Sequence, residues 1–478
     1  MDDKIRKQIK TFVNPACVAV IGASDRMGSW GSIIMQGLQR CKFPGRLYPV
    51  NHSASTVSGL KAYPNIRAIP ERVDLAILAV PAESILEIIR GCAEKGVQGI
   101  TIIAAGFGEA VQGGREQELD LARLARQNDM RLLGPNVSGT FNLHEGFNAS
   151  ASPPDFLAPS PITAICQGSY AIYDLLVGSY WRKMGIGQFI HTGNECDLEV
   201  TDFLEYFGDD PRTEVIVMYL ETLRNVNRFR EVAAKVALKK PLIVQKVGKT
   251  PGGSRAARSH TGAMAGDDVF YQALFQQLNI IPSPTMERLI PLGHAFLKLP
   301  PLQGNRVAII TMGGSWGVAL TDQLEQRGLH VPELSPSLQA KLRGMGMPIR
   351  ASTRNPVDIG AAVSSTFPFD TVPGMVQEVV GSNEVDALIL HGFGRLALAR
   401  EPNPGTEATL DMEKNVMREC ASLQERSEKP ILIGSAILPS QSQAVHDLTQ
   451  EGIIIFHQLD EIADVLSLKY LHHQFLSH

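Results

Sequence analysis

One histidine of the chain stands among residues that would leave an imidazole exposed to reactants. His260 lies in residues 249–266, KTPGGSRAARSHTGAMAG, where small residues dominate and no hydrophobic period indicates a core. The segment follows an apolar run, PLIVQKVG, so it predicts a long loop after a strand. An imidazole on such a loop can act as a nucleophile or a base near neutral pH, whereas most single histidines in loops are solvated surface residues.

Glycine-rich turns offer possible anion sites at three places. Backbone N–H groups at the start of a helix can hold a phosphate. The turns are GASDRMGSWG from Gly22, the pair Gly168 and Ser169, and the run Gly313, Gly314 and Ser315. The first lacks the G-x-G-x-x-G spacing of a dinucleotide site, because Ser24 stands where the second glycine belongs. This disfavours NAD, and a purely structural tight turn remains the alternative at each place.

The elements that would position these residues repeat along the chain. Units beginning near Cys17, Ile162 and Arg306 each have an apolar β-branched run, a small-residue turn and then alternating helix and strand patterns. Such alternation predicts parallel sheets with helices on both faces. A proline-rich stretch after residue 150 and the sequence LPPLQG mark the boundaries. We therefore predict an α/β protein of three doubly wound domains, over residues 1–150, 151–302 and 303–478.

The composition excludes several classes of protein. The 478 residues include 45 Lys and Arg against 49 Asp and Glu, a formal net charge of −4, so nucleic acid is not an expected partner. No apolar run is long enough to span a bilayer, and we expect no membrane association. The 6 cysteines have no CxxC spacing, which predicts neither a zinc site nor a disulfide framework. We expect a cytoplasmic protein without a metal site.

The segment around His260 resembles a known motif. SRAARSHTGAMAG is similar to the phosphohistidine loop of the NDP-forming acyl-CoA synthetases, which are relatives of the succinyl-CoA synthetase α subunit. The resemblance covers nearly the whole chain, through GASDRMGSWG, YPVN, VDLAILAVPAE, AAGFGE, LGPNVSG, GNECD, YLE, GGSWGV and NPVD in order. It implies an N-terminal Rossmann-like CoA-binding domain followed by two flavodoxin-like, succinyl-CoA synthetase-like domains.

The resemblance also implies a reaction and the residues that carry it. The family interconverts acyl-CoA, ADP or another NDP, and phosphate with a carboxylic acid, CoA and NTP. His260 would carry the phosphoryl group taken from an acyl phosphate, and Glu221 would hydrogen-bond its ring. The phosphate would be bound by Gly168, Ser169, Gly313, Gly314 and Ser315. Coenzyme A would contact Gly22, Ser24, Gly28, Asn51, Val80, Pro81 and Asn136.

Two departures from the family pattern keep a second hypothesis open. The family's S-Q-S-G turn stands here as Cys166 to Ser169, C-Q-G-S, so its Gly and Ser are in inverted order, and Glu195 replaces the lysine of G-N-K-x-D. Glu195 and Asp197 could belong to a site or to the surface. Glu221 could be a solvated strand-end acid, and Asn136 a turn residue. The alternative function is a CoA or acyl-CoA sensor or scaffold without turnover.

The nucleotide would require another chain. No Walker A motif is present, and the sequence leaves no room for the ATP-grasp domain that the resemblance requires. We therefore expect a separate β-type ATP-grasp subunit that binds ADP or ATP with Mg, and a hetero-oligomer. The acyl group and the choice of ADP over GDP stay open.

Overall fold

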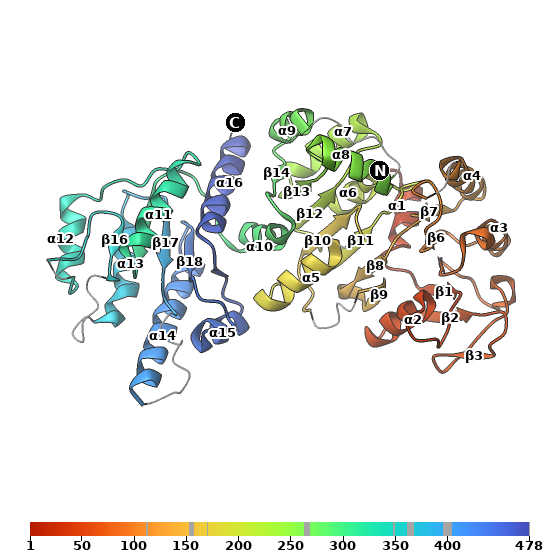
Figure 1. The fold of residues 1–478 in the computed structure, drawn as a ribbon, viewed down its shortest axis with the longest axis horizontal. Coiled ribbons are helices and arrows are strands. Elements are labelled where there is room, and N and C mark those ends of the chain that lie inside the picture. Colours follow the sequence, from red (N-terminus) through yellow and green to blue (C-terminus); the bar gives the residue numbers. More distant parts are fainter. Residues whose placement is uncertain are drawn as a thin grey trace. The chain divides into compact units, whose positions relative to one another are not determined.

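The computed structural model describes residues 1–110, 113–152, 157–169, 171–261, 268–347, 349–360, 368–394 and 404–477, without the side chains of residues 258–261 and 404–409. These residues form two compact units (Figure 1). The first comprises Met1–Tyr180 and Met184–Gly293, and the second comprises Trp181–Lys183 and His294–His478.

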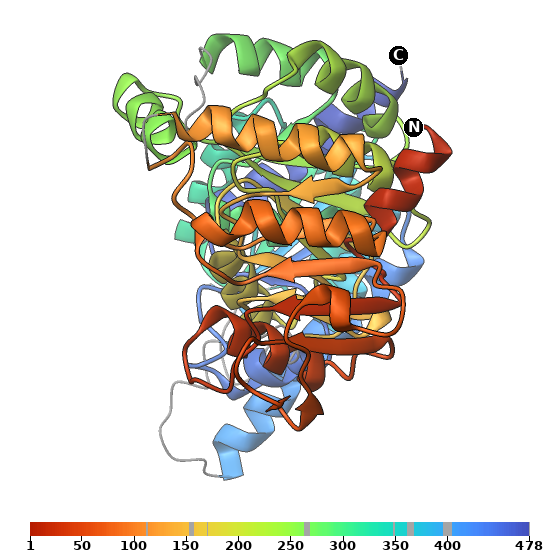
Figure 2. The same ribbon diagram turned by 90° about the vertical axis from the view of Figure 1, so that its right-hand side faces the viewer.

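The first sheet of the first unit is parallel, with the order β2-β1-β5-β6-β7. Its strands are β1 (Cys17–Ile21), β2 (Arg46–Val50), β5 (Leu75–Leu78), β6 (Gly99–Ile102) and β7 (Arg131–Leu133), and β3 (Thr56–Val57) and β4 (Leu60–Lys61) form a separate hairpin. The helices are α1 (Asp3–Lys10), α2 (Trp30–Arg40), α3 (Ile85–Lys95) and α4 (Gly114–Gln127). Figure 2 shows these strands side by side, with the orange helices α3 and α4 alongside them.

Both faces of this sheet are buried, which explains its continuous apolar strands. Alternate residues of β1 enter different cores, because successive side chains of a strand point to opposite faces. Ala19 packs in a cluster with Ile89 of α3 and Ala125 of α4. Val20 packs in another cluster with Ile34 of α2.

The second sheet of the same unit has the order β14-β13-β12-β10-β11-β8-β9. Its strands are β8 (Gly139–Asn142), β9 (Phe147–Ser150), β10 (Ile162–Cys166), β11 (Gln188–His191), β12 (Val215–Leu220), β13 (Leu242–Lys246) and β14 (Ile281–Pro282). The helices are α5 (Ala171–Arg182), α6 (Val200–Gly208), α7 (Val226–Ala237), α8 (Pro251–Thr261), α9 (Asp268–Gln277) and α10 (Leu289–Lys298). The hairpin β8–β9 was not predicted from the sequence, and its strand β8 pairs antiparallel with β11.

The segment around His260 differs from its predicted conformation. Residues predicted as a loop form helix α8, and His260 lies in its last turn, with its side chain outside the described residues. The Thr250 hydroxyl accepts a hydrogen bond from the Gly253 N–H at 3.1 Å, as an N-cap does, and Pro251 fills the first helical position. Capping by Thr250 and Pro251 therefore starts a helix at a place where Gly252 and Gly253 disfavour one. Residues 262–267, the rest of the predicted loop, lie outside the described residues.

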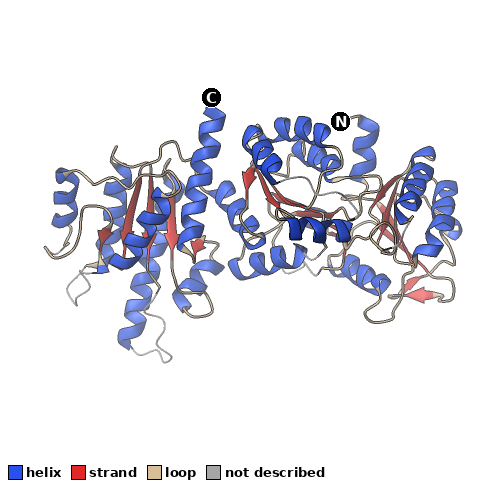
Figure 3. Ribbon diagram, turned by 45° about the horizontal axis from the view of Figure 1, so that its top comes forward, coloured by secondary structure: helices blue, strands red, loops and turns tan. Residues whose placement is uncertain are grey.

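The second unit contains one parallel sheet of order β16-β15-β17-β18-β19, flanked by helices (Figure 3). Its strands are β15 (Val307–Thr311), β16 (Val357–Asp358), β17 (Ala387–His391), β18 (Ile431–Gly434) and β19 (Ile455–Phe456). The helices are α11 (Gly314–Glu325), α12 (Pro336–Gly344), α13 (Val372–Gly381), α14 (Pro404–Arg426), α15 (Gln443–Gln450) and α16 (Leu459–Ser477). Short 3₁₀ helices occur at Ile66–Ala68, Ala82–Ser84, Leu143–Glu145, Met286–Arg288 and Phe369–Thr371.

The predicted fold class is confirmed. In each of the three large sheets the first strand of a repeat lies between the second and the third, which is the doubly wound order. The division at residues 150 and 302 stays a prediction. Among the helices that the structure describes, none combines the length and the apolar character needed to cross a membrane.

Candidate functional site

A pocket of about 580 Å³ lies in the first unit at the carboxyl edge of the second sheet. Gly168 and Ser169 after β10, Glu221 after β12, and Gly253 of α8 line it. Parallel strands bring their carboxyl ends to one edge, so residues far apart in sequence meet there. We call this cavity the strand-edge pocket. It unites the predicted phosphate turn, the predicted carboxylate and the helix that carries His260.

The Gln167 side chain holds the backbone at Glu221, whose carboxylate belongs to this pocket. The Glu221 N–H donates a hydrogen bond to Gln167 Oε1 at 2.6 Å, and the Thr222 N–H donates to the same oxygen at 2.9 Å. Gln167 Nε2 in turn donates to the Thr222 carbonyl at 2.8 Å. Glu221 is 4% exposed, so it is not a solvated strand-end acid. Gln167 was not predicted as a site residue, although its place directly before the Gly–Ser turn is the signal that could have indicated it.

The geometry explains why glycine precedes serine in this turn. A side chain at residue 168 would place its Cβ 2.8 Å from Cε1 of Tyr219 and 3.2 Å from Oε1 of Glu221. Real Cβ atoms do not approach other atoms at 2.8 Å, so Gly168 allows both side chains to occupy their positions. Because residue 168 is glycine and not serine, the Tyr219 ring and the Glu221 carboxylate can both lie beside this turn.

The GNECD segment carries a buried ion pair rather than a surface charge. The Asp197 carboxylate is enclosed and accepts hydrogen bonds from Arg126 Nε at 2.6 Å, from Arg131 Nε at 2.8 Å and from the Leu132 N–H at 2.8 Å. These contacts tie the segment to β7 of the first sheet. Asp197 therefore joins the two sheets of the unit and does not line the strand-edge pocket.

Glu195 is buried beside Arg224, with Glu195 Oε2 3.7 Å from Arg224 Nε. Burial raises the pKa of Glu195 to about 7, and the attraction of Arg224 opposes this only in part. Burial also lowers the pKa of Arg224. Both shifts have the same cause, because a low-dielectric surrounding disfavours either charge.

We predict a measurable pH dependence from Glu195. Its pKa is about 7 in the folded chain against a reference of 4.5, so the folded state binds this proton more tightly. The resulting stabilisation is complete below pH 4.5 and is lost as the pH rises through 7. Glu195→Gln keeps the group neutral, so urea unfolding should show that the variant gains about 2–3 kcal/mol of stability relative to the unsubstituted chain between pH 5 and pH 8. If the free energies of unfolding of the two proteins changed in parallel with pH, the raised pKa of Glu195 would be refuted.

A second pocket, of about 330 Å³, lies at the carboxyl edge of the first sheet. Gly22, Asn51 and Val80, three of the residues predicted to bind CoA, line it together. Gly22 has a φ of +88°, and a Cβ there would lie 2.4 Å from the Ala79 carbonyl oxygen, so the turn requires glycine. We call this cavity the first-sheet pocket.

Asn51 closes the turn above the first-sheet pocket. Asn51 Nδ2 donates to the Ala23 carbonyl at 2.8 Å, and its Oδ1 accepts from the N–H groups of Ser53 and Ala54 at 2.9 Å. Arg67 was not predicted from the sequence; it lines the same pocket, and its Nη2 lies 2.9 Å from Glu94 Oε1. Its 3₁₀ turn is too short to leave a periodic signal.

The other predicted CoA residues lie outside the set that lines the first-sheet pocket. Ser24 Oγ accepts a hydrogen bond from the Arg26 N–H at 3.0 Å, and Gly28 is exposed in the same turn. Pro81 precedes the 3₁₀ helix Ala82–Ser84. Asn136, with a φ of +62°, donates to Asn194 Oδ1 at 3.3 Å.

The third predicted turn begins helix α11 in the second unit. Gly313 is the N-cap residue of this helix, and Gly314 and Ser315 form its first turn. The Gly313 N–H donates to Thr311 Oγ1 at 3.2 Å, which fixes the turn to the end of β15. The described residues contain no group of three or more His, Cys, Asp and Glu side chains suited to a metal ion.

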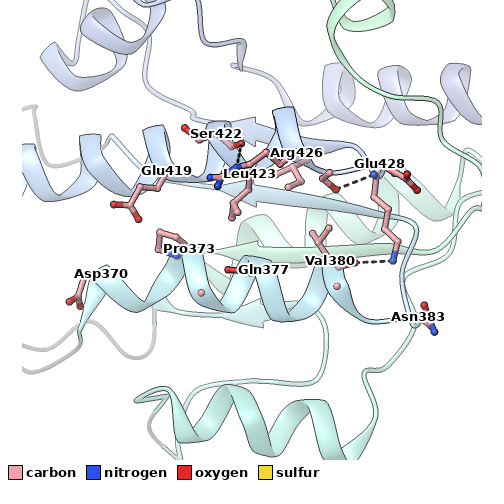
Figure 4. Close-up of a pocket in the computed structure, with 15 residues that line it drawn as sticks. Asp370, Pro373, Gln377, Val380, Asn383, Glu419, Ser422, Leu423, Arg426 and Glu428 are labelled. Atoms are coloured by element: carbon pink, nitrogen blue, oxygen red, sulfur yellow. Dashed lines mark hydrogen bonds between the residues drawn. The ribbon is translucent and has the colours of Figure 1, made fainter.

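A cavity of about 820 Å³ in the second unit lies between α13 and α14, and no predicted residue lines it. Figure 4 shows Pro373, Gln377 and Val380 facing Leu423 and Arg426 across it. Lys429 Nζ donates to the carbonyls of Val380 at 2.8 Å and Ser382 at 2.6 Å, so this cation closes the end of α13.

Comparison with known protein families gives two matches. Residues 16–141 match a CoA binding domain, and residues 159–296 match a succinyl-CoA ligase like flavodoxin domain. The first range contains the first-sheet pocket, and the second contains the strand-edge pocket.

Several named proteins are similar over most of the chain. The α subunit of ADP-forming acetate–CoA ligase I of Pyrococcus furiosus is 37% identical over 468 residues, 97% of each chain. The α subunit of ligase II of that organism is 36% identical over 77% of this chain and 79% of its own. The ADP-forming acetate–CoA ligase of Methanocaldococcus jannaschii is 35% identical over 74% of this chain but only 49% of its own.

A solved structure has the same fold. It is the dinucleotide-forming acetyl-coenzyme A synthetase 1 of Ca. Korarchaeum cryptofilum in complex with phosphate and ADP. The TM-score is 0.85 at 30% identity, over 98% of this chain and 97% of that chain.

Proposed function

Because the chain belongs to the family of ADP-forming acetate–CoA ligase α subunits, we propose that it converts acyl-CoA, ADP and phosphate reversibly into a carboxylic acid, CoA and ATP. The observation that carries this proposal is the strand-edge pocket, where Gly168, Ser169, Glu221 and helix α8 meet. The relatives are named as ligases, which supports an enzyme over the sensor or scaffold alternative.

The reaction divides into three transfers. Phosphate attacks the acyl-CoA carbonyl and CoA leaves as its thiolate, which forms an acyl phosphate. A ring nitrogen of His260 then attacks the phosphorus atom, the P–O bond to the acyl group breaks, and the carboxylate leaves. ADP finally accepts the phosphoryl group from His260. Each step needs a nucleophile held in line and donors for the phosphoryl charge.

Glu221 orients the histidine in this proposal. A buried carboxylate that accepts one imidazole N–H leaves the other nitrogen unprotonated for attack. Gln167, which directly precedes Gly168, hydrogen-bonds the backbone at Glu221 and Thr222, so the end of β12 is joined to the proposed phosphate turn. Backbone N–H groups at the start of α5, at Gly168 and Ser169, would bind the phosphoryl group, and Gly313, Gly314 and Ser315 at the start of α11 are proposed as further phosphate-binding residues.

We expect Glu221→Gln to slow phosphoryl transfer about 10²-fold while leaving acyl-CoA binding unchanged, because glutamine keeps the shape but loses the charge that stabilises the imidazolium. Rapid-quench phosphorylation of the full chain measures the rate, and titration with acyl-CoA measures the binding. An equal loss of binding and rate would indicate a folding defect rather than an orienting role.

Coenzyme A is assigned to the N-terminal domain. Gly22, Asn51 and Val80 would form the wall of its site in the first-sheet pocket, where apolar side chains and a few polar groups suit a nucleotide-like ligand. The further contacts proposed for CoA are Ser24, Gly28, Pro81 and Asn136. The domain division is residues 1–150 for CoA binding and 151–302 and 303–478 for two succinyl-CoA synthetase-like domains.

A partner subunit would bind the nucleotide. The two relatives from P. furiosus are named α subunits, which supports a second subunit, and the M. jannaschii ligase is about twice as long as the part that this chain matches. The partner is an ATP-grasp β-type subunit that binds ADP or ATP with Mg, in a cytoplasmic hetero-oligomer. The histidine would move between the CoA site and this partner.

The test of this function is phosphorylation of the purified full chain. Incubation with acetyl-CoA and inorganic phosphate should add one acid-labile phosphoryl group to the peptide that contains residue 260. Measurable CoA binding without phosphorylation by any acyl-CoA would favour the sensor instead.

A further inference from the structure

Tyr219 lines the strand-edge pocket, and neither the proposed reaction nor the fold uses its hydroxyl group. It lies on β12, opposite Cys166 of β10 and Gln245 of β13 in the sheet register. Its backbone carbonyl accepts a hydrogen bond from the Gln167 N–H at 3.1 Å. Its ring edge lies against Gly168, where an added Cβ would meet Cε1 at 2.8 Å. The phenol is therefore held at the turn that would bind the phosphate.

Tyr219 is half-buried and lines the strand-edge pocket, so its hydroxyl group is not enclosed in the core. Its register neighbour Gln245 also lines the pocket, and Gln245 Oε1 is buried without a hydrogen-bond partner within the described part of the chain. Polar groups inside proteins are nearly always hydrogen-bonded, so the buried Gln245 Oε1 indicates that this pocket holds a further polar group. The Tyr219 O–H can donate a hydrogen bond to an anionic ligand in this pocket, whereas Gln245 Oε1 can only accept one.

The charges of the pocket favour a neutral donor for an anionic ligand. Asp174 and Glu221 line it, and none of its described lining residues is a lysine or an arginine. A phosphoryl group carries nearly two negative charges near pH 7. Burial and the nearby Glu221 carboxylate raise the pKa of Tyr219 to about 12, so its proton stays available for donation.

We propose that the Tyr219 O–H donates a hydrogen bond to the phosphoryl group bound in the strand-edge pocket. This inference rests on the proposed function and adds a phosphate-binding side chain to it. The donor compensates for the absence of a cation from the described lining, and it lies beside Gly168, whose lack of a side chain makes room for it.

Tyr219→Phe tests this role, because it removes the hydroxyl group and keeps the ring that packs against Gly168. The rate of phosphorylation of the full chain is measured over a range of inorganic phosphate concentrations at saturating acetyl-CoA. It is then measured over a range of acetyl-CoA concentrations at saturating phosphate. The half-saturating phosphate concentration should rise about tenfold to a hundredfold, as for a lost hydrogen bond to a charged group. The half-saturating acetyl-CoA concentration and the unfolding temperature should stay unchanged.

Tyr206→Phe is the matched control. Tyr206 of α6 is also half-buried, burial also raises its pKa to about 12, and it lies outside the pocket lining. This variant should keep the phosphate dependence of the unsubstituted chain.

The other possible results distinguish a failure of the role of Tyr219 from a failure of the proposed function. If Tyr219→Phe keeps the original phosphate dependence while the unsubstituted chain is phosphorylated, Tyr219 does not bind the phosphoryl group and the proposed function stands. A rise in the acetyl-CoA requirement alone would place Tyr219 at the acyl group and overturn the proposal. If the unsubstituted chain gains no phosphoryl group from any acyl-CoA, the proposed function and the role of Tyr219 fail together.

Discussion

A chain with alanine in place of His260 is expected to gain no phosphoryl group from acetyl-CoA and phosphate. With a nucleotide-binding partner present, ATP formation should fall by roughly 10³-fold or more, since no other side chain would accept the phosphoryl group. The structure places residue 260 in the last turn of α8, whose earlier residues Gly253, Ala256 and Ala257 line the strand-edge pocket. The expected loss concerns the chemistry, so CoA binding should persist. Intact mass under alkaline and acidic conditions measures the label, and calorimetry measures CoA binding.

A second histidine provides the control for this loss. His330 is exposed in the second unit, where its Nδ1 lies 3.6 Å from Glu325 Oε1. His330→Ala should be phosphorylated at the unsubstituted rate. An acid-labile label that persists in His260→Ala would show that another residue is the carrier and would refute the assignment of His260.

Replacing Asp197 by alanine is expected to lower the free energy of unfolding of the first unit by about 3–5 kcal/mol. The carboxylate is fully enclosed and accepts hydrogen bonds from Arg126 and Arg131 and from the Leu132 N–H. Its removal would leave Arg131, itself mostly buried, with an uncompensated charge, which costs more than the ion pair contributes when intact. Urea unfolding followed by circular dichroism measures the change.

An exposed pair on α4 offers the comparison. Asp120 Oδ1 lies 2.6 Å from Arg123 Nη1, and both side chains are about two-thirds exposed. Asp120→Ala should change the free energy of unfolding by less than about 1 kcal/mol. If Asp197→Ala lowered the free energy of unfolding as little as Asp120→Ala does but slowed phosphoryl transfer, Asp197 would act in the reaction and would not stabilise the junction between the sheets.

The predicted strands of the three units agree with the structure, and the reason is local. An apolar β-branched run that ends in a small-residue turn commits its own residues to a strand and a helix start, as at β1, β10 and β15. The segment of His260 was predicted wrongly as a loop, because the capping by Thr250 and Pro251 outweighs the glycines that follow. The hairpin β8–β9 was missed because it is stabilised by pairing with β11, a strand that lies later in the sequence.

The residues of the candidate site could also be predicted only in part from the sequence. The sequence by itself determined Gly168, Ser169, Glu221 and His260 as residues of interest, since each follows a strand or stands in a distinctive motif. Only the tertiary structure decided that Glu221 is buried, that Gln167 holds it and that Tyr219 fills the space left by Gly168. It also decided that Asp197 serves the junction of two sheets. The physical reason is that a strand pattern is a property of neighbouring residues, whereas burial and contact depend on the register of strands about 50 residues apart in the chain, such as Cys166 opposite Tyr219.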